Sequence, residues 1–385
     1  MKQTRSVAFG SQPAAADDRL RCVLRSRPAR TAVVVGAALL LGACGGGPSR
    51  HALVLPTATS AVTATASSTP LTAASGPAPT ERLVRWHGPV MNIFFHPLVI
   101  KPQLAFTTDA LGVGFQDYFV TAYEFERILD GLYRHGWTLV DAHDAARGQV
   151  MVPKGRKPLV LSEDDVNYYR YFKGRGLAAK LVLTATGQIL AQIGGHDPRT
   201  TSDDVVPMVD QFVAQHPDFS VGGAKGVLGL TGYEGLLGYH HLGNPVERQR
   251  VIALAAALKA DGWTFASHTY GHIDLTTDSL ATIAYDTKRW KRLAVSLIGP
   301  TDLLIYPFGA RPSAAGAELL HKAGFPIQFD IDVRPRRYHL GGAIVMSRLH
   351  IDGFAFQAPD RMRQLFSVRK VLDPSRPWPL DVADQ

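Results

Sequence analysis

Two histidines that stand four residues apart form the sequence's most suggestive motif, Ser267-His268-Thr269-Tyr270-Gly271-His272. Residues i and i+4 of a helical turn share one face, with Cβ atoms about 5–6 Å apart. This spacing lets two imidazoles bind one cation. The pair follows an apolar run, and so do two other polar groups, Asp164-Asp165 upstream and His350 downstream. We therefore predict a metal site assembled from strand ends.

The supply of ligands narrows the choice of metal. The only two cysteines, Cys22 and Cys44, lie near the N-terminus, so the expected folded domain offers no thiolate ligand and no disulfide. Any metal there must be held by His, Asp or Glu. Imidazoles and carboxylates suit a divalent ion such as Zn²⁺, with Co²⁺ or a similar ion also possible.

Length and charge limit the classes of protein. The chain has 385 residues, of which 46% are hydrophobic, enough for a substantial core. Its net charge of +8 is concentrated before Cys44, where seven Lys/Arg meet two acids, and the rest of the chain has 34 basic and 31 acidic residues. That balance gives no reason to expect nucleic acid binding.

The N-terminal region resembles a secretion signal. A basic flank is followed by the apolar run 31–43, which is short for a membrane span and ends Leu41-Gly42-Ala43-Cys44. This ending resembles the lipobox of bacterial lipoproteins, which implies lipidation of Cys44 and an extracytoplasmic, membrane-anchored protein. A plain signal peptide or an uncleaved anchor is the alternative. Residues 1–44 are thus the expected signal, and the Ala/Thr/Ser/Pro-rich stretch 45–84 the expected disordered linker.

Alternating strand and helix patterns begin near Arg85. Short apolar runs predict strands at 90–96, 137–140, 157–162, 177–184, 263–266, 303–305, 325–329 and 344–349. Helical spacing and stop signals predict helices at 123–135, 205–215, 245–260, 280–298 and 314–323. This alternation favours parallel β/α units. We expect a domain over 85–371, with a Gly/aromatic-rich insertion at 191–245 and a Pro-rich tail at 372–385 on its surface.

The order of these motifs resembles the polysaccharide deacetylase family, the carbohydrate esterases with a NodB homology domain. The resemblance covers roughly residues 90–355 and rests on four matches. Its first motif, Thr-Phe-Asp-Asp-Gly, is similar to residues 162–166, and its His-x-x-x-His motif to 267–272. Its Arg-x-Pro-Tyr/Phe-Gly motif is similar to 305–309, and its last to Leu349-His350. The family's fold would be a deformed (β/α) barrel.

The resemblance implies a role for each matched residue. Asp164 would be the general base, and His350 would protonate the leaving group. Asp165, His268 and His272 would bind the metal. Tyr306, Pro307 and Phe308 would form the turn that binds substrate, with the backbone N–H of Phe308 stabilising the oxyanion.

Two departures from the family pattern concern the tuning of the site. Ile305 stands where the family has an arginine that orients the base. The family's fourth motif, which supplies an acid or Trp near the last histidine, has no clear match, and Asp330 and Asp332 are candidates. His96 could also line the cleft. The aromatic residues Trp86, Tyr168, Tyr169 and Tyr171 could either stack on sugars or pack the domain.

The predicted activity is therefore a metal-dependent deacetylation. The enzyme would hydrolyse N-acetyl or O-acetyl groups of a cell-envelope or extracellular glycan, such as peptidoglycan or a chitin-like oligomer, and would act on carbon–nitrogen bonds other than peptide bonds. Its contact with the membrane would be through the lipid anchor only. Two alternatives stay open: a catalytically impaired surface lipoprotein that binds glycan, or a hydrolase of another amide.

Overall fold

The structure, a computed structural model, describes residues 82–194 and 199–377. The predicted signal, Cys44, nearly all of the predicted linker and the last eight residues lie outside these ranges. None of the described helices combines the length and the apolar character needed to cross a membrane.

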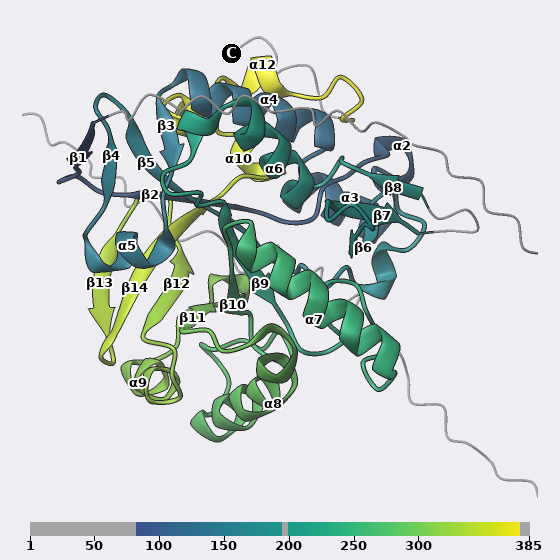
Figure 1. Cartoon of the computed structure of the whole chain (residues 1–385), viewed down its shortest axis with the longest axis vertical. Coiled ribbons are helices and arrows are strands. Elements are labelled where there is room, and N and C mark those ends of the chain that lie inside the picture. The colour runs from purple at the N-terminus through teal and green to yellow at the C-terminus, as the bar shows by residue number, and fades with distance from the viewer. Residues whose placement is uncertain (1–81, 195–198, 378–385) are drawn as a thin grey trace, which may run out of the picture. The chain divides into compact units, whose positions relative to one another are not determined.

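Parallel strands close into a barrel at the centre of the domain (Figure 1). Their order is β2 (Met91–Phe95), β5 (Lys157–Glu163), β9 (Gly226–Leu230), β10 (Trp263–Ser267), β11 (Leu303–Ile305), β12 (Ile327–Ile331) and β14 (Ala343–His350). Pairings of β12 with β14 and of β14 with β2 close the ring of seven strands. The strands are almost wholly buried, as expected where helices cover a parallel sheet. The predicted deformed (β/α) barrel is confirmed.

Long helices surround the barrel, and their bounds agree closely with the sequence patterns. They are α4 (Ala122–Arg134), α6 (Val205–Gln215), α7 (Pro245–Ala260), α8 (Leu280–Ile298) and α9 (Ala314–Lys322). Each begins at a side chain that accepts a backbone N–H: Thr121, Asp204, Asn244, Ser279 and Ser313. These caps satisfy donors that a helix leaves open, which is why local sequence placed the helices well.

The predicted insertion at 191–245 is wrong in extent, because β9 lies inside it and pairs with β5 and β10. The pattern was missed because Gly226 and Gly229 lower the β-propensity of this strand. A Cβ at Gly226 would stand 2.7 Å from the Leu161 carbonyl oxygen, so only glycine fits. The inserted part is an antiparallel sheet of β6 (Ala178–Leu183), β7 (Ile189–Ile193) and β8 (Arg199–Thr201), followed by α6.

Shorter elements complete the domain. β1 (Leu83–Arg85) pairs with β4 (Met151–Pro153), so this strand includes the last two residues of the predicted linker. The remaining strands are β3 (Trp137–Leu139), which pairs with β5, and β13 (Arg337–Leu340), which pairs with β14. The short helices are α2 (Pro102–Ala105), α3 (Ala110–Tyr118), α5 (Ala142–Arg147), α10 (Gly353–Phe356), α11 (Pro359–Met362) and α12 (Val368–Val371).

The described part of the predicted tail, residues 372–377, is anchored to the domain by one buried side chain, although residues 374, 375 and 377 are exposed. Arg376 is buried, and its guanidinium donates to both carboxylate oxygens of Glu124, at 2.8 and 2.6 Å. It also donates to the backbone oxygens of Gln116 and Phe119. A buried arginine with four acceptor atoms thus fixes residues 372–377 to the domain, which the proline content of the tail did not indicate.

One histidine lies between two carboxylates and therefore makes a pH-dependent contribution to stability. His143, on α5, lies 3.3 Å from Asp141 and 2.8 Å from Asp302, the residue before β11. Hydrogen bonds to Asp141 and Asp302 raise the pKa of His143 to about 10. Because the folded pKa exceeds the unfolded value of about 6.5, this stabilisation is complete below pH 6.5 and is lost as the pH rises towards 10.

We expect His143→Gln to lower the free energy of unfolding by about 1 kcal/mol at pH 6, allowing for the solvent screening of a half-exposed pair. The difference from wild type should shrink between pH 6.5 and 10. Urea unfolding at pH 6, 8 and 10 measures it, with His135→Gln as a control at an exposed histidine whose Nδ1 faces the backbone oxygen of Gly131 instead of a carboxylate. A difference that stays constant over this range would contradict the assignment.

Candidate active site

The predicted site residues meet at the carboxyl ends of the barrel strands. A cavity of about 370 Å³ opens there. It is lined by residues at the end of β14 and just after β2, β5 and β10, including His96, Asp164, Asp165, His268, His272 and His350. Loops at this end of a β/α barrel carry the active sites of such folds, because the strands all point their carboxyl ends to one face.

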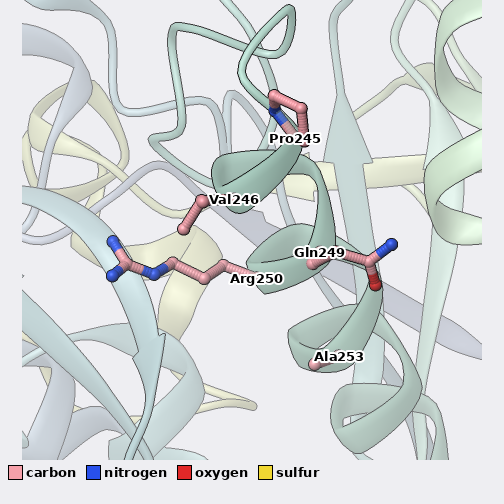
Figure 2. A pocket seen from close by; sticks show the side chains of 5 residues that line it. All are labelled: Pro245, Val246, Gln249, Arg250 and Ala253. Atoms are coloured by element: carbon pink, nitrogen blue, oxygen red, sulfur yellow. The ribbon is translucent and has the colours of Figure 1, made fainter.

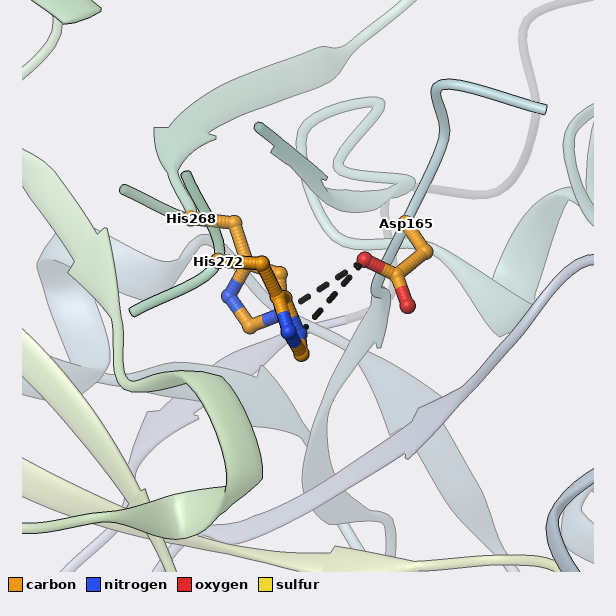
Figure 3. Close-up of side chains that lie close together, drawn as sticks. All are labelled: Asp165, His268 and His272. Carbon is orange, nitrogen blue, oxygen red and sulfur yellow. Dashed lines mark ion pairs between the residues drawn. The ribbon is translucent and has the colours of Figure 1, made fainter. Parts of the chain in front are cut away.

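Asp165, His268 and His272 form the one group in the described residues that could hold a metal ion through three side chains (Figure 3). One carboxylate oxygen of Asp165 lies 3.8 Å from the Nε2 atom of each histidine. Tetrahedral ligands at about 2.0 Å from Zn²⁺ stand about 3.3 Å apart. A divalent ion therefore fits among these atoms with small side-chain movements, and the donor set of two imidazoles and a carboxylate suits Zn²⁺.

The orientation of His268 is set by a backbone group. Its Nδ1 lies 3.1 Å from the carbonyl oxygen of Ile305, at the end of β11. With the proton on Nδ1 donated to this oxygen, Nε2 keeps its lone pair and faces Asp165. Ile305 thus contributes to the site through its backbone.

The two histidines stand on a loop and not on a helical turn, contrary to the geometry assumed from their spacing. Thr269 and His272 have φ values of 60° and 51°, a region that costs energy for residues with a side chain. Asp286, on α8, offsets this cost. Its buried carboxylate accepts the N–H groups of Tyr270 and Gly271 at 2.6 and 2.8 Å. Tertiary hydrogen bonds therefore bring the imidazoles together.

Asp164 has a partner that the sequence did not reveal. The guanidinium of Arg348, in β14, donates to both carboxylate oxygens of Asp164 at 2.7 and 2.8 Å. Arg348 is fully buried, and it also lies 4.1 Å from the ring of Phe94. Burial alone would raise the pKa of Asp164, but the charge of Arg348 and its hydrogen bonds hold that pKa well below its usual range. Asp164 thus pairs with an arginine on another strand, although position 305 carries an isoleucine.

His350 is held between an acid and a second histidine. Its Nδ1 lies 2.8 Å from a carboxylate oxygen of Asp352, and its Nε2 lies 3.1 Å from Nδ1 of His96. His96 in turn is 3.9 Å from Asp165. Burial and the neighbouring His350 lower the pKa of His96 to about 4, so His96 is neutral near pH 7. His96 lines the cavity, and these distances place it between His350 and the metal-binding group.

The acid beside His350 is neither of the two predicted candidates. Asp330 accepts hydrogen bonds from Arg311 and Tyr338. Asp332 lines the cavity but pairs with Arg336. The partner is Asp352, two residues after His350. The spacing i, i+2 places side chains on one face of an extended chain, and this was the available signal.

The turn after β11 contributes one residue of its predicted three to the cavity. Tyr306 and Pro307 are buried, and the hydroxyl of Tyr306 donates to Gln328. Phe308 lines the cavity, has a φ of 60° and packs edge-on against His272, with ring centroids 4.3 Å apart. The turn thus packs against the ring of His272, one of the three candidate metal ligands.

A second depression lies elsewhere, on the outer face of α7 (Figure 2). It is lined by Pro245, Val246, Gln249, Arg250 and Ala253. Arg250 is its one charged side chain, so it offers no set of groups for acid–base or metal chemistry. The cavity at the barrel's carboxyl end is therefore the candidate active site.

No protein-family model matches the sequence, and no curated protein matches it. Solved structures with a similar fold are those of polysaccharide deacetylases, the family that the motifs resemble. The deacetylase PplD of Streptococcus pyogenes, in complex with acetate, is 13% identical, with 73% of this chain and 99% of that chain covered and a TM-score of 0.46.

Two further structures are similar to the same extent. IcaB of Ammonifex degensii is 13% identical, with 74% of this chain and 97% of that chain covered and a TM-score of 0.43. A de-N-acetylase of Aggregatibacter actinomycetemcomitans is 14% identical, with 69% and 96% covered and a TM-score of 0.43. Identities this low describe a likeness of fold, and function has to be argued from the site itself.

Proposed function

We propose that this protein is a metal-dependent deacetylase that removes acetyl groups from the amino sugars of an acetylated glycan such as peptidoglycan or a chitin-like oligomer. One observation carries the proposal: a three-ligand metal group, an ionised Asp164 and the acid-paired His350 line a single cavity. Hydrolysis of an amide by metal-activated water uses these three functions together.

The metal would be held by Asp165, His268 and His272. A divalent ion bound there supplies a Lewis acid that lowers the pKa of water towards about 7. The preference for Zn²⁺ is part of the proposal, supported by the nitrogen and oxygen donors.

Two side chains of the protein transfer the protons of the reaction. Asp164, kept ionised by Arg348, accepts the proton that water loses as its oxygen bonds to the acetyl carbon. His350 gives a proton from Nε2 to the amide nitrogen, so that the C–N bond breaks and leaves acetate and a free amine. Asp352 holds His350 in the orientation and tautomer for this transfer.

Arg348 weakens the case for a glycan-binding protein without turnover. That alternative was motivated by the missing arginine at position 305, and the structure supplies one from β14. A pure binder has no need of an oriented base beside the metal. The location, outside the cytoplasm and anchored through lipid on Cys44, also remains a proposal, supported by the sequence of the N-terminal region.

The test is metal removal and restoration on the full chain. We expect chelator-treated protein to release no acetate from N-acetylated chito-oligosaccharides or peptidoglycan, and Zn²⁺ to restore release at one ion per chain. Acetate assays and elemental analysis measure both quantities. The double variant His268→Ala/His272→Ala should bind no zinc and stay inactive. Wild-type protein that binds no metal near neutral pH would refute the site, and metal-loaded protein that releases no acetate would favour a binder or another amide.

A further inference from the structure

Three tyrosine rings form one wall of the cavity, which we call the tyrosine wall: Tyr169, Tyr171 and Tyr233. Tyr169 lies in the middle, stacked on Tyr171 at a centroid distance of 5.5 Å and on Tyr233 at 5.1 Å. The planes of each pair differ by 17° and 18°. All three rings line the cavity that holds Asp165 and the histidines.

The tyrosine wall is built from two loops that are tied together. Asn167, fully buried, donates to the backbone oxygens of Thr231 and Gly235 and accepts the N–H of Thr231 at 2.8 Å. The N–H of Arg170 donates to Glu234 at 2.8 Å. Because several hydrogen bonds join the loops after β5 and β9, the rings are fixed before any ligand binds, and less ordering entropy is lost on binding.

The central ring and the outer rings have different tasks. Tyr169 is 3% exposed, and its hydroxyl donates to Asp165 at 2.6 Å. It is enclosed on both faces and serves the metal-binding carboxylate. Tyr171 and Tyr233 are half-buried, and the stack with Tyr169 covers one face of each ring. Tyr171 also packs edge-on against Phe172, with ring centroids 4.7 Å apart. Both outer rings are nevertheless part of the cavity lining.

Other groups around the cavity can bind hydroxyls. Asp332 and Arg361 line it together with the half-buried ring of Phe354. A carboxylate and a guanidinium each offer two parallel hydrogen-bonding positions. Aromatic faces combined with such planar polar groups match a pyranose ring, which has flat C–H faces and hydroxyls around its edge.

We propose that Tyr171 and Tyr233 contact the sugar ring of the substrate and determine how strongly the site prefers an acetylated sugar to an acetyl compound without a ring. This inference rests on the function proposed above and assigns two residues to its substrate recognition. The rings would pack on the sugar next to the acetyl group under attack, and their effect would be on binding rather than on proton transfer.

The test compares a sugar substrate with a small acetyl ester that has no ring. Zinc-loaded full chain is assayed on N-acetylchitotetraose and on vinyl acetate. We expect Tyr171→Ala and Tyr233→Ala each to lower the ratio of the two kcat/KM values about tenfold, through a higher KM for the tetraose. Tyr171→Phe and Tyr233→Phe should retain the ratio, since the ring is kept. Tyr285→Ala, at an exposed tyrosine on α8, is the matched control.

Two kinetic outcomes would overturn the inference, and a binding measurement decides if no hydrolysis is seen. An equal loss on both substrates would show that the wall acts through Asp165 alone. An unchanged ratio in both alanine variants would show that sugars bind elsewhere. If wild-type protein hydrolyses neither substrate, calorimetric binding of the tetraose decides: binding weakened in the alanine variants supports the sugar contact although the deacetylase proposal has failed, whereas binding that is unchanged or absent refutes it.

Discussion

Replacing Arg348 by methionine should lower acetate release by about 10²- to 10³-fold, approaching the loss of about 10³-fold expected for Asp164→Asn. Arg348 makes two hydrogen bonds to Asp164 and is fully buried. Without it, burial would raise the pKa of Asp164 and the carboxylate would lose its fixed orientation. Acetate release from N-acetylchitotetraose, measured on zinc-loaded protein, gives the rates.

Position 305 offers a rescue that a merely structural role would not allow. A Cβ built on Gly229 lies 3.2 Å from both Oδ1 of Asp164 and Cδ1 of Ile305, so the two side chains approach the same point. Ile305→Arg in the Arg348→Met background should recover at least about tenfold in rate, because a guanidinium can again approach Asp164. Full activity of Arg348→Met alone would show that Asp164 needs no arginine.

Folding has to be separated from catalysis in this series. Arg348→Met leaves a buried unpaired carboxylate, which costs about 3–5 kcal/mol. Asp164→Asn/Arg348→Met removes that charge and should fold more stably than Arg348→Met while staying inactive. Metal content near one ion per chain marks each variant as correctly folded.

Replacing Arg376 by methionine should lower the free energy of unfolding by about 3–5 kcal/mol, because Glu124 is left charged and buried without its partner. Neither side chain of this pair is exposed to solvent. Arg376 also joins the C-terminal segment to the end of α3 through Gln116 and Phe119. For a domain of this size, the midpoint of thermal unfolding should fall by about 10 °C.

The controls separate a buried ion pair from an exposed one. Lys322→Ala breaks the exposed pair with Glu318 and should leave the thermal midpoint close to that of wild type, because solvent screens exposed ion pairs. Glu124→Leu/Arg376→Met removes both charges and should be more stable than Arg376→Met alone, since well-packed apolar groups often replace a buried ion pair without loss. A thermal midpoint of Arg376→Met within 2 °C of wild type would contradict the assigned role.

The sequence by itself determined the features that depend on near neighbours in the chain. Helix bounds such as 245–260 and 280–298 agree with the structure because apolar spacing and capping residues are local. The positions of Asp165, His268 and His272 also followed from the sequence, since polar residues directly after apolar runs come together where parallel strands end.

Only the tertiary structure decided what depends on closure of the barrel. Arg348 and Asp164 stand 184 residues apart, and no local pattern marks an arginine inside an apolar strand as the partner of that acid. The sequence does not predict β9 as a strand, because it contains glycines where the neighbouring strands come too close for a side chain. The conformation of the His268–His272 loop likewise depends on Asp286 from a later helix. Side chains that are far apart in the sequence come into contact because strand pairing sets the distance between them. The spacing of residues along the chain does not reveal which strands pair.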